Sequence, residues 1–121
     1  MYIIINRATM NPDPKEKSLY IPIHRPCPVG NPYHLINTQD QAERDKVCDD
    51  YENWFNDQIV NQPEDSDFFK YIELIRKIHR ENGKVYLVCF CAPKRCHGET
   101  IKRFCEEQDE KENVDGSTKS T

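Results

Sequence analysis

The chain has 121 residues, the usual size of one domain, and a second domain is not expected. Hydrophobic residues make up 36% of it and charged residues 31%, so we expect a thin core. No stretch approaches the roughly 20 apolar residues of a membrane span, and the first residues lack the pattern of a secretion signal. We therefore expect a cytoplasmic protein with no membrane partner.

The net charge of −4 is unevenly distributed along the chain. Residues 106–121 hold six acidic residues against two lysines, which leaves the remainder neutral overall. A neutral body lacks the basic surface with which proteins hold nucleic acid through its phosphates, so a nucleic-acid partner is disfavoured. A local site for a single phosphate remains compatible with this charge.

The first half of the chain predicts two strands and a loop. Apolar runs over 2–6 and 19–23 are typical of short strands, and Pro22 limits the second to an edge or an irregular end. The turn-rich segment between them would allow the two strands to pair as a hairpin. Residues 24–37 carry three prolines and predict an irregular loop of a length that is commonly functional.

The second half predicts three helices and one strand. A capping box of Thr38 and Gln41 begins a helix over 39–60, and Asp65 or Ser66 caps a second that ends at Gly83. Residues 84–90 are almost continuously apolar, as in a central strand, and a third helix runs from near His97 to about Gln108.

These elements predict an α/β fold. We expect one small domain over 1–107, with a short mixed or parallel sheet of about three to four strands and helices packed on it. Residues 108–121 are polar and acidic, and we expect them to form a disordered tail.

Cysteines cluster after the central strand. Of six cysteines in the chain, three fall together with a histidine within residues 89–97. Without an export signal thiols stay reduced, and clustered cysteines then indicate metal or thiolate chemistry. Ligands of α/β domains gather at the carboxyl ends of central strands, which is where this cluster lies.

Three interpretations of the cluster stay open. Cys89, Cys91, Cys96 and His97 together form a Cys3His set suited to zinc, although the spacing is unusual and the last two are neighbours. Alternatively, the cations Lys94 and Arg95 and a helix amino terminus favour a thiolate at Cys91 or Cys96, with His97 as base or proton donor. In the third, Cys89 is a core residue, the other thiols pack and His97 caps the helix. For Cys48 and Cys105, each alone on a helix, we expect core packing.

Two segments resemble a known family. Residues 25–33 (RPCPVGNPY) and 87–99 (LVCFCAPKRCHGE) are similar to the domain of unknown function 4326, which occurs in bacteria and many phages. The late segment satisfies the pattern Cys-x-Cys-x-Pro-x-x-Cys-His at every position, and the resemblance covers nearly all of 18–105. Cys27 departs from the family, where small hydroxylated residues are frequent, so it receives no role. The family has no assigned activity, and the resemblance implies a fold and a site but no reaction.

The resemblance also implies that the early segment belongs with the cysteine cluster. Arg25, Gly30 and Asn31 would then bind a ligand, presenting a guanidinium and backbone N–H groups to an anion or nucleobase. A structural interpretation stays open, in which Arg25 holds an internal carboxylate and residues 30–32 form a tight turn.

Two functions of different classes follow. The first is the binding of a nucleotide-related or phosphorylated small molecule, with or without catalysis, where Cys91, Cys96 and His97 line the reactive end. The second is a noncatalytic module, stiffened by zinc or packed thiols, that binds a host protein or sequesters a small nucleotide. Zinc is the one cofactor that the residues indicate, and the sequence leaves the ligand, reaction and oligomeric state open.

Overall fold

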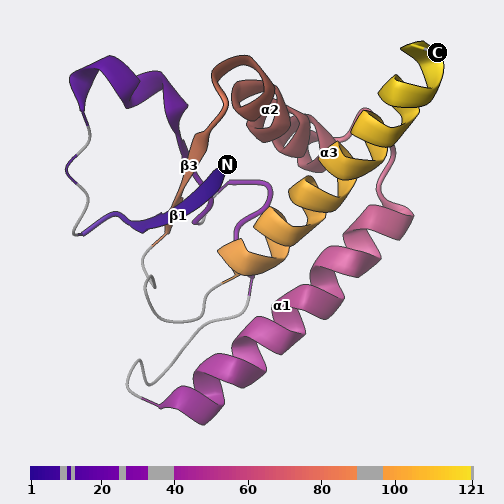
Figure 1. The fold of residues 1–121 in the computed structure, drawn as a ribbon. Coiled ribbons are helices and arrows are strands. Elements are labelled where there is room, and N and C mark those ends of the chain that lie inside the picture. Colours follow the sequence, from indigo (N-terminus) through magenta and orange to yellow (C-terminus); the bar gives the residue numbers. More distant parts are fainter. Residues whose placement is uncertain (9–10, 12, 25–26, 33–39, 90–96, 121) are drawn as a thin grey trace.

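The computed structural model describes residues 1–8, 11, 13–24, 27–32, 40–89 and 97–120, with side chains as far as residue 112. Three strands of one sheet and the helices around it make a small α/β domain, as expected from the sequence (Figure 1). In chain order the elements are β1 (Tyr2–Asn6), the 3-10 helix η1 (Pro14–Leu19), β2 (Tyr20–Pro22), α1 (Gln41–Asn61), α2 (Asp67–Asn82), β3 (Val85–Cys89) and α3 (Gly98–Ser120).

The sheet is parallel, with β3 in its centre. The strand order is β1-β3-β2, and both outer strands pair with β3 in parallel. The predicted hairpin of the first two strands is therefore wrong, whereas the central place predicted for residues 84–90 is confirmed. The physical reason is that β3 is the most continuously apolar strand, and such a strand is most stable with a neighbour on each side.

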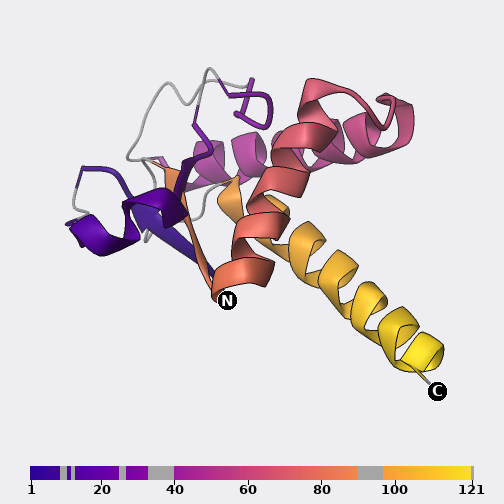
Figure 2. The same ribbon diagram turned by 90° about the horizontal axis from the view of Figure 1, so that it is seen from above.

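The two faces of the sheet are covered differently. Tyr2, Ile4, Val85, Leu87 and Cys89 alternate onto one face and belong to the core or pack against it. Figures 1 and 2 show α1, α2 and α3 gathered on this side of the sheet and η1 on the other. On the η1 side the ring of Tyr86 stacks on Tyr20, and its hydroxyl donates to Glu16 of η1 at 2.7 Å.

Local sequence signals fix the ends of α1 and α2. Asp40 caps α1 by accepting a hydrogen bond from the Glu43 N–H at 3.1 Å, so the cap is not the expected Thr38, which lies outside the described residues. Ser66 caps α2 through the N–H of Phe69 at 3.3 Å, and Gly83 ends it in the left-handed region at φ 78°.

Helix α3 begins where predicted but extends further. The backbone carbonyl of His97 accepts hydrogen bonds from the N–H groups of Thr100 and Ile101, which confirms the start near His97. The helix does not end near Gln108, because Asp109 and Glu112 form ion pairs with Arg76 of α2 at 3.0 Å and 2.7 Å. Asp109 and Glu112 thus belong to α3, while the domain over 1–107 and the disordered tail over 108–121 stay predictions.

All three α-helices contribute to one core on the sheet. Cys48 and Cys105 are buried in it, as expected for thiols that pack, and burial raises the pKa of Cys105 to about 12. Within the part of the chain that the structure describes, no helix is long and apolar enough to cross a membrane. The largest fully buried helical side chains are Tyr51, Phe55, Ile75 and Ile101.

Candidate functional site

The carboxyl ends of the three parallel strands meet at one edge of the sheet. Here the backbone carbonyl of Cys89 accepts a hydrogen bond from the Arg7 N–H at 2.7 Å. The carbonyl of Val88 accepts one from the Ile23 N–H at 3.0 Å. The segments that leave β1 and β2 therefore start beside the end of β3, which is the place where α/β domains bind ligands.

The imidazole of His97 is oriented at this edge by a buried hydrogen bond. Its side chain is 7% exposed, and Nε2 lies 2.6 Å from the backbone carbonyl oxygen of Ile23. A carbonyl oxygen only accepts hydrogen bonds, so Nε2 carries the hydrogen. In the neutral ring Nδ1 then has the lone pair, which makes Nδ1 the atom that can take a proton or bind a metal.

Tyr51 of α1 joins the early segment to His97. Its hydroxyl donates to the backbone carbonyl of Val29 at 2.6 Å in a buried setting. Its ring packs against the ring of His97 in a T-shaped arrangement, with 5.0 Å between centroids. His97 therefore contacts Ile23 directly and Val29 indirectly, through Tyr51. Ile23 and Val29 lie on either side of position 25 in the sequence.

The described part of the early loop is a hydrogen-bonded turn. The N–H of Cys27 donates to the backbone carbonyl of His24 at 3.2 Å, and the N–H of Gly30 donates to the backbone carbonyl of Cys27 at 2.9 Å. Gly30 and Asn31 directly follow Val29, so they lie within two residues of the Tyr51 contact. Burial raises the pKa of the Cys27 thiol, which opposes thiolate chemistry there and agrees with giving it no role.

Cys89 lies in the hydrophobic core. It is fully buried on the helix-covered face at the last position of β3. Among the described residues, no group of three or more histidine, cysteine or acidic side chains is placed to hold a metal ion. Arg25, Cys91 and Cys96 lie outside those residues, so the zinc set and the thiolate interpretation both stay predictions.

Asn6 is a residue of this edge that the sequence reasoning missed. The parallel register pairs Asn6 with Cys89, which places it in the same row of the sheet on the helix-covered face. Its side-chain oxygen accepts a hydrogen bond from the Ala8 N–H at 2.8 Å, which shapes the chain as it leaves β1. The available signal was a polar residue at the end of an apolar run, which becomes informative once the strands are known to be parallel.

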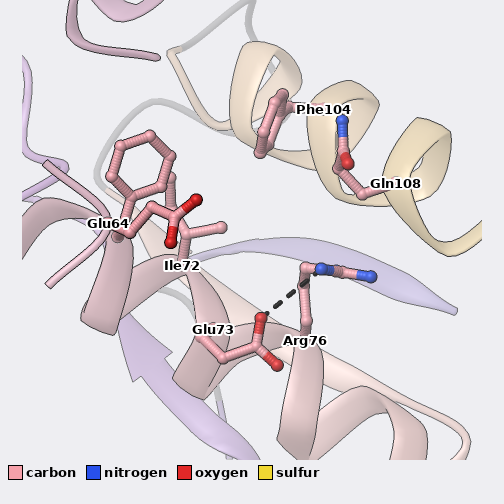
Figure 3. Close-up of a pocket in the computed structure, with 7 residues that line it drawn as sticks. Glu64, Ile72, Glu73, Arg76, Phe104 and Gln108 are labelled. Atoms are coloured by element: carbon pink, nitrogen blue, oxygen red, sulfur yellow. Dashed lines mark hydrogen bonds and ion pairs between the residues drawn. The ribbon is translucent and has the colours of Figure 1, made fainter. Parts of the chain in front are cut away.

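A cavity of about 260 Å³ lies elsewhere, between α2 and α3 (Figure 3). Its apolar lining includes Phe69, Ile72 and Phe104, and its lining contains none of the predicted site residues. Arg76 is the cation of this cavity, and it already pairs with Glu73 at 3.4 Å as well as with the two acidic residues of α3. We therefore assign the cavity no part in the candidate site.

Comparison with protein families confirms the resemblance. Residues 5–107 match the family described as Domain of unknown function (DUF4326). The match spans most of the chain, which therefore belongs to this family. No curated protein and no solved structure was found to match the chain.

Proposed function

We propose, for this member of a family without an assigned activity, that the protein binds a phosphorylated or nucleotide-related small molecule at the carboxyl edge of its sheet. The ligand would lie between the loop of Arg25, Gly30 and Asn31 and the segment that ends in His97. The observation that carries this proposal is the pair of contacts from Ile23 and, through Tyr51, from Val29 to His97. These contacts bring together two segments that are about 70 positions apart in the chain, which supports a shared site.

The residue chemistry assigns a role to each end of the site. Arg25 would hold an anionic group through charge-assisted hydrogen bonds, with backbone N–H groups near Gly30 and the amide of Asn31 completing the contact. At the other end Cys91 or Cys96 would act as thiolate, with His97 Nδ1 taking or giving a proton. This reactive end is what would make the protein an enzyme.

The distribution of acidic residues supports an anionic ligand. Only two of the 21 acidic residues, Asp13 and Asp40, fall in 7–13, 23–40 and 90–97, the segments that leave the carboxyl ends of β1, β2 and β3, and both cap helices. The same segments contain Arg7, Arg25, Lys94 and Arg95. Although the chain as a whole is negative, these segments carry more cations than acidic residues, which favours binding of an anion.

Titration calorimetry with orthophosphate and with adenosine monophosphate tests this proposal. We expect the wild type to bind, and Arg25→Ala to bind at least about tenfold more weakly, because a charge-assisted hydrogen bond is lost. Arg80→Ala is the matched control, since it removes a half-exposed arginine of α2 that pairs with Glu73, and its binding should be unchanged. Equal affinity in wild type and Arg25→Ala, or no binding by the wild type, would contradict the proposal.

A second candidate function is a noncatalytic zinc module that binds a host protein or sequesters a small nucleotide. The hydrogen bond from His97 Nε2 to a backbone carbonyl favours it, because metal-binding histidines usually donate their other ring N–H in this way. Cys91 and Cys96, with or without Cys89, would then join Nδ1 around the ion.

Metal analysis of protein prepared without chelator tests this candidate. We expect about one equivalent of zinc, lost on Cys91→Ser or Cys96→Ser, because each removes a thiolate ligand. Cys48→Ser is the matched control, since Cys48 is buried on α1 and should leave the metal content unchanged. A folded wild type with less than about a tenth of an equivalent would exclude the zinc module.

A further inference from the structure

We infer that the cavity between α2 and α3 is a docking site for an arginine side chain of a partner protein, presented beside apolar residues of that partner. The inference goes beyond the proposed function, because the cavity contains none of the residues assigned to the carboxyl edge. Every residue that lines it belongs to the described part of the chain. Two of these residues, Glu64 and Glu73, are exposed, so a partner can reach the cavity from solvent.

The apolar lining of the cavity comes from both helices. Ile72 of α2 is buried, and Phe69 of α2 and Phe104 of α3 are partly buried. Figure 3 shows Ile72 on the α2 side of the cavity and Phe104 on the α3 side. The volume of about 260 Å³ is below the roughly 300 to 1,000 Å³ of pockets that enclose a whole small molecule. The cavity is therefore better suited to one or two side chains of another protein.

The polar groups of the cavity favour a donor of hydrogen bonds. Within the described residues, neither the carboxylate of Glu64 nor the amide of Gln108 has a partner. Figure 3 shows these two side chains on opposite sides of the cavity, Glu64 on the α2 side and Gln108 on α3. A guanidinium has five N–H donors and no acceptor, so it can donate to the carboxylate and to the amide oxygen.

The charge around the cavity is complementary to a cation, although an arginine already lines it. Two arginines of α2, Arg76 and Arg80, pair with three carboxylates, those of Glu73, Asp109 and Glu112. Glu64 is a fourth carboxylate of the same region. Two positive charges against four negative charges leave an excess of two negative charges, which attracts a cationic partner and repels an anionic one.

Arginine fits this combination better than lysine does. Its planar group can donate two parallel hydrogen bonds to the carboxylate of Glu64, whereas an ammonium is a point charge. A guanidinium also stacks on aromatic rings, which Phe69 and Phe104 provide here. The apolar stem of an arginine can pack along Ile72. Arginine is moreover one of the residues that contribute most to binding between proteins.

An NMR titration of the isotope-labelled full chain with blocked tripeptides tests the inference. The probe is acetyl-Leu-Arg-Leu-amide, and its control contains citrulline, which has the shape of arginine without the charge. We expect the arginine peptide to shift the amide signals of 64–76 and 104–108 and to bind at least about fivefold more tightly than the control. Glu64→Gln, a change in the exposed turn before α2, should remove most of this preference. Glu81→Gln changes an exposed residue of α2 outside the cavity and should keep it.

Each other outcome overturns the inference. If the wild type binds both peptides equally, or neither at about 10 mM peptide, the cavity does not recognise arginine. If Glu64→Gln keeps the preference, the cation is bound elsewhere on the chain. If the same signals shift with protein concentration alone, a second copy of the chain occupies the cavity, and the partner is not a different protein. None of these results affects the phosphate titrations with Arg25→Ala, so the proposed function stands or fails separately.

Discussion

The two ends of the parallel sheet hold their charges in opposite ways. At the amino end, Arg76 lies against acidic side chains of α2 and α3, and the hydroxyl of Tyr2 donates to Asp109 of α3. At the carboxyl end, the segments that leave the strands contain arginines, a lysine and histidines, and their two acidic residues, Asp13 and Asp40, cap helices. The difference agrees with a stabilising role for the amino end and with the proposal that the carboxyl end binds an anion.

Asp109 is the centre of the amino-end network. Its carboxylate accepts hydrogen bonds from Tyr2 of β1 and from Nε of Arg76 at 3.0 Å, and it lies 3.3 Å from Nδ1 of His79. Burial and the bond to Asp109 raise the pKa of Tyr2 well above its ordinary value, so the phenol stays protonated and donates. One residue of α3 thereby fastens this helix to β1 and α2.

The largest effect we expect comes from removing the acidic partners of Arg76. A chain cut after Gln108 loses Asp109 and Glu112 and leaves a buried guanidinium with one exposed acidic neighbour, Glu73. We expect the free energy of unfolding to fall by about 2 to 3 kcal/mol, somewhat less than for a fully buried pair. Urea unfolding measures it. A chain cut after Glu112 is the control and should change by less than about 0.5 kcal/mol. Equal stability of the two truncated chains would show that the network contributes nothing.

The sequence predicted those parts of the fold that depend on neighbouring residues. The apolar run of β3, the Ser66 cap and the Gly83 end of α2 are local signals, and the structure confirms each of them. The hairpin of the first two strands and the end of α3 near Gln108 were wrong, because both depend on contacts between residues far apart in the chain. Asp109 and Glu112 look like part of a polar tail until their partner Arg76, more than thirty positions earlier, is brought to them.

In the candidate site, too, the features that depend on neighbouring residues were predicted and those that depend on distant residues were not. Its place at the end of the central strand followed from the pattern of apolar residues, and His97 was identified from its neighbours in sequence. The sequence predicted neither which nitrogen of His97 carries the hydrogen nor the role of Tyr51. Both depend on Ile23 and Val29, which are distant from these residues along the chain. Tyr51 lies on the buried face of α1, but a buried phenol also needs a partner, and that partner is set by the tertiary fold.

The second prediction tests whether Tyr51 organises the carboxyl end. Tyr51→Phe keeps the ring against His97 and deprives the buried Val29 carbonyl of a donor, so we expect a loss of about 1 to 2 kcal/mol in unfolding free energy. Orthophosphate binding should weaken as well, because the early loop is held less firmly. The control Tyr86→Phe loses a bond to Glu16 on the opposite face of the sheet, and its orthophosphate affinity should match the wild type. Unchanged stability and binding in Tyr51→Phe would show that Tyr51 does not couple the early loop to His97.

The smallest effect we expect is a pH dependence at the amino end that originates at His79. The imidazole stacks on Tyr2, and its Nε2 contacts the amino group of Met1, which also donates to the Gly83 carbonyl at 2.8 Å. Neutral His79 suits both of its neighbours, because Nδ1–H can donate to Asp109 while Nε2 accepts from the N-terminal ammonium. Burial and the charge of that ammonium hold the pKa of His79 below its ordinary value, against the opposing pull of Asp109 and Glu106.

A lowered pKa in the folded state fixes the sign of the effect. Above the ordinary histidine pKa of about 6.5, His79 is neutral in both states and its contribution to stability is complete. As the pH falls below that value the unfolded chain takes up a proton that the folded chain resists, so the free energy of unfolding declines. We expect His79→Gln to flatten this decline between about pH 7 and pH 5, measured by urea unfolding at each pH. Asn61→Gln, a change of a non-titrating side chain at the end of α1, is the control and should keep the wild-type slope. If His79→Gln keeps that slope too, the N-terminal ammonium does not oppose protonation of His79, and the amino-end network does not extend to Met1.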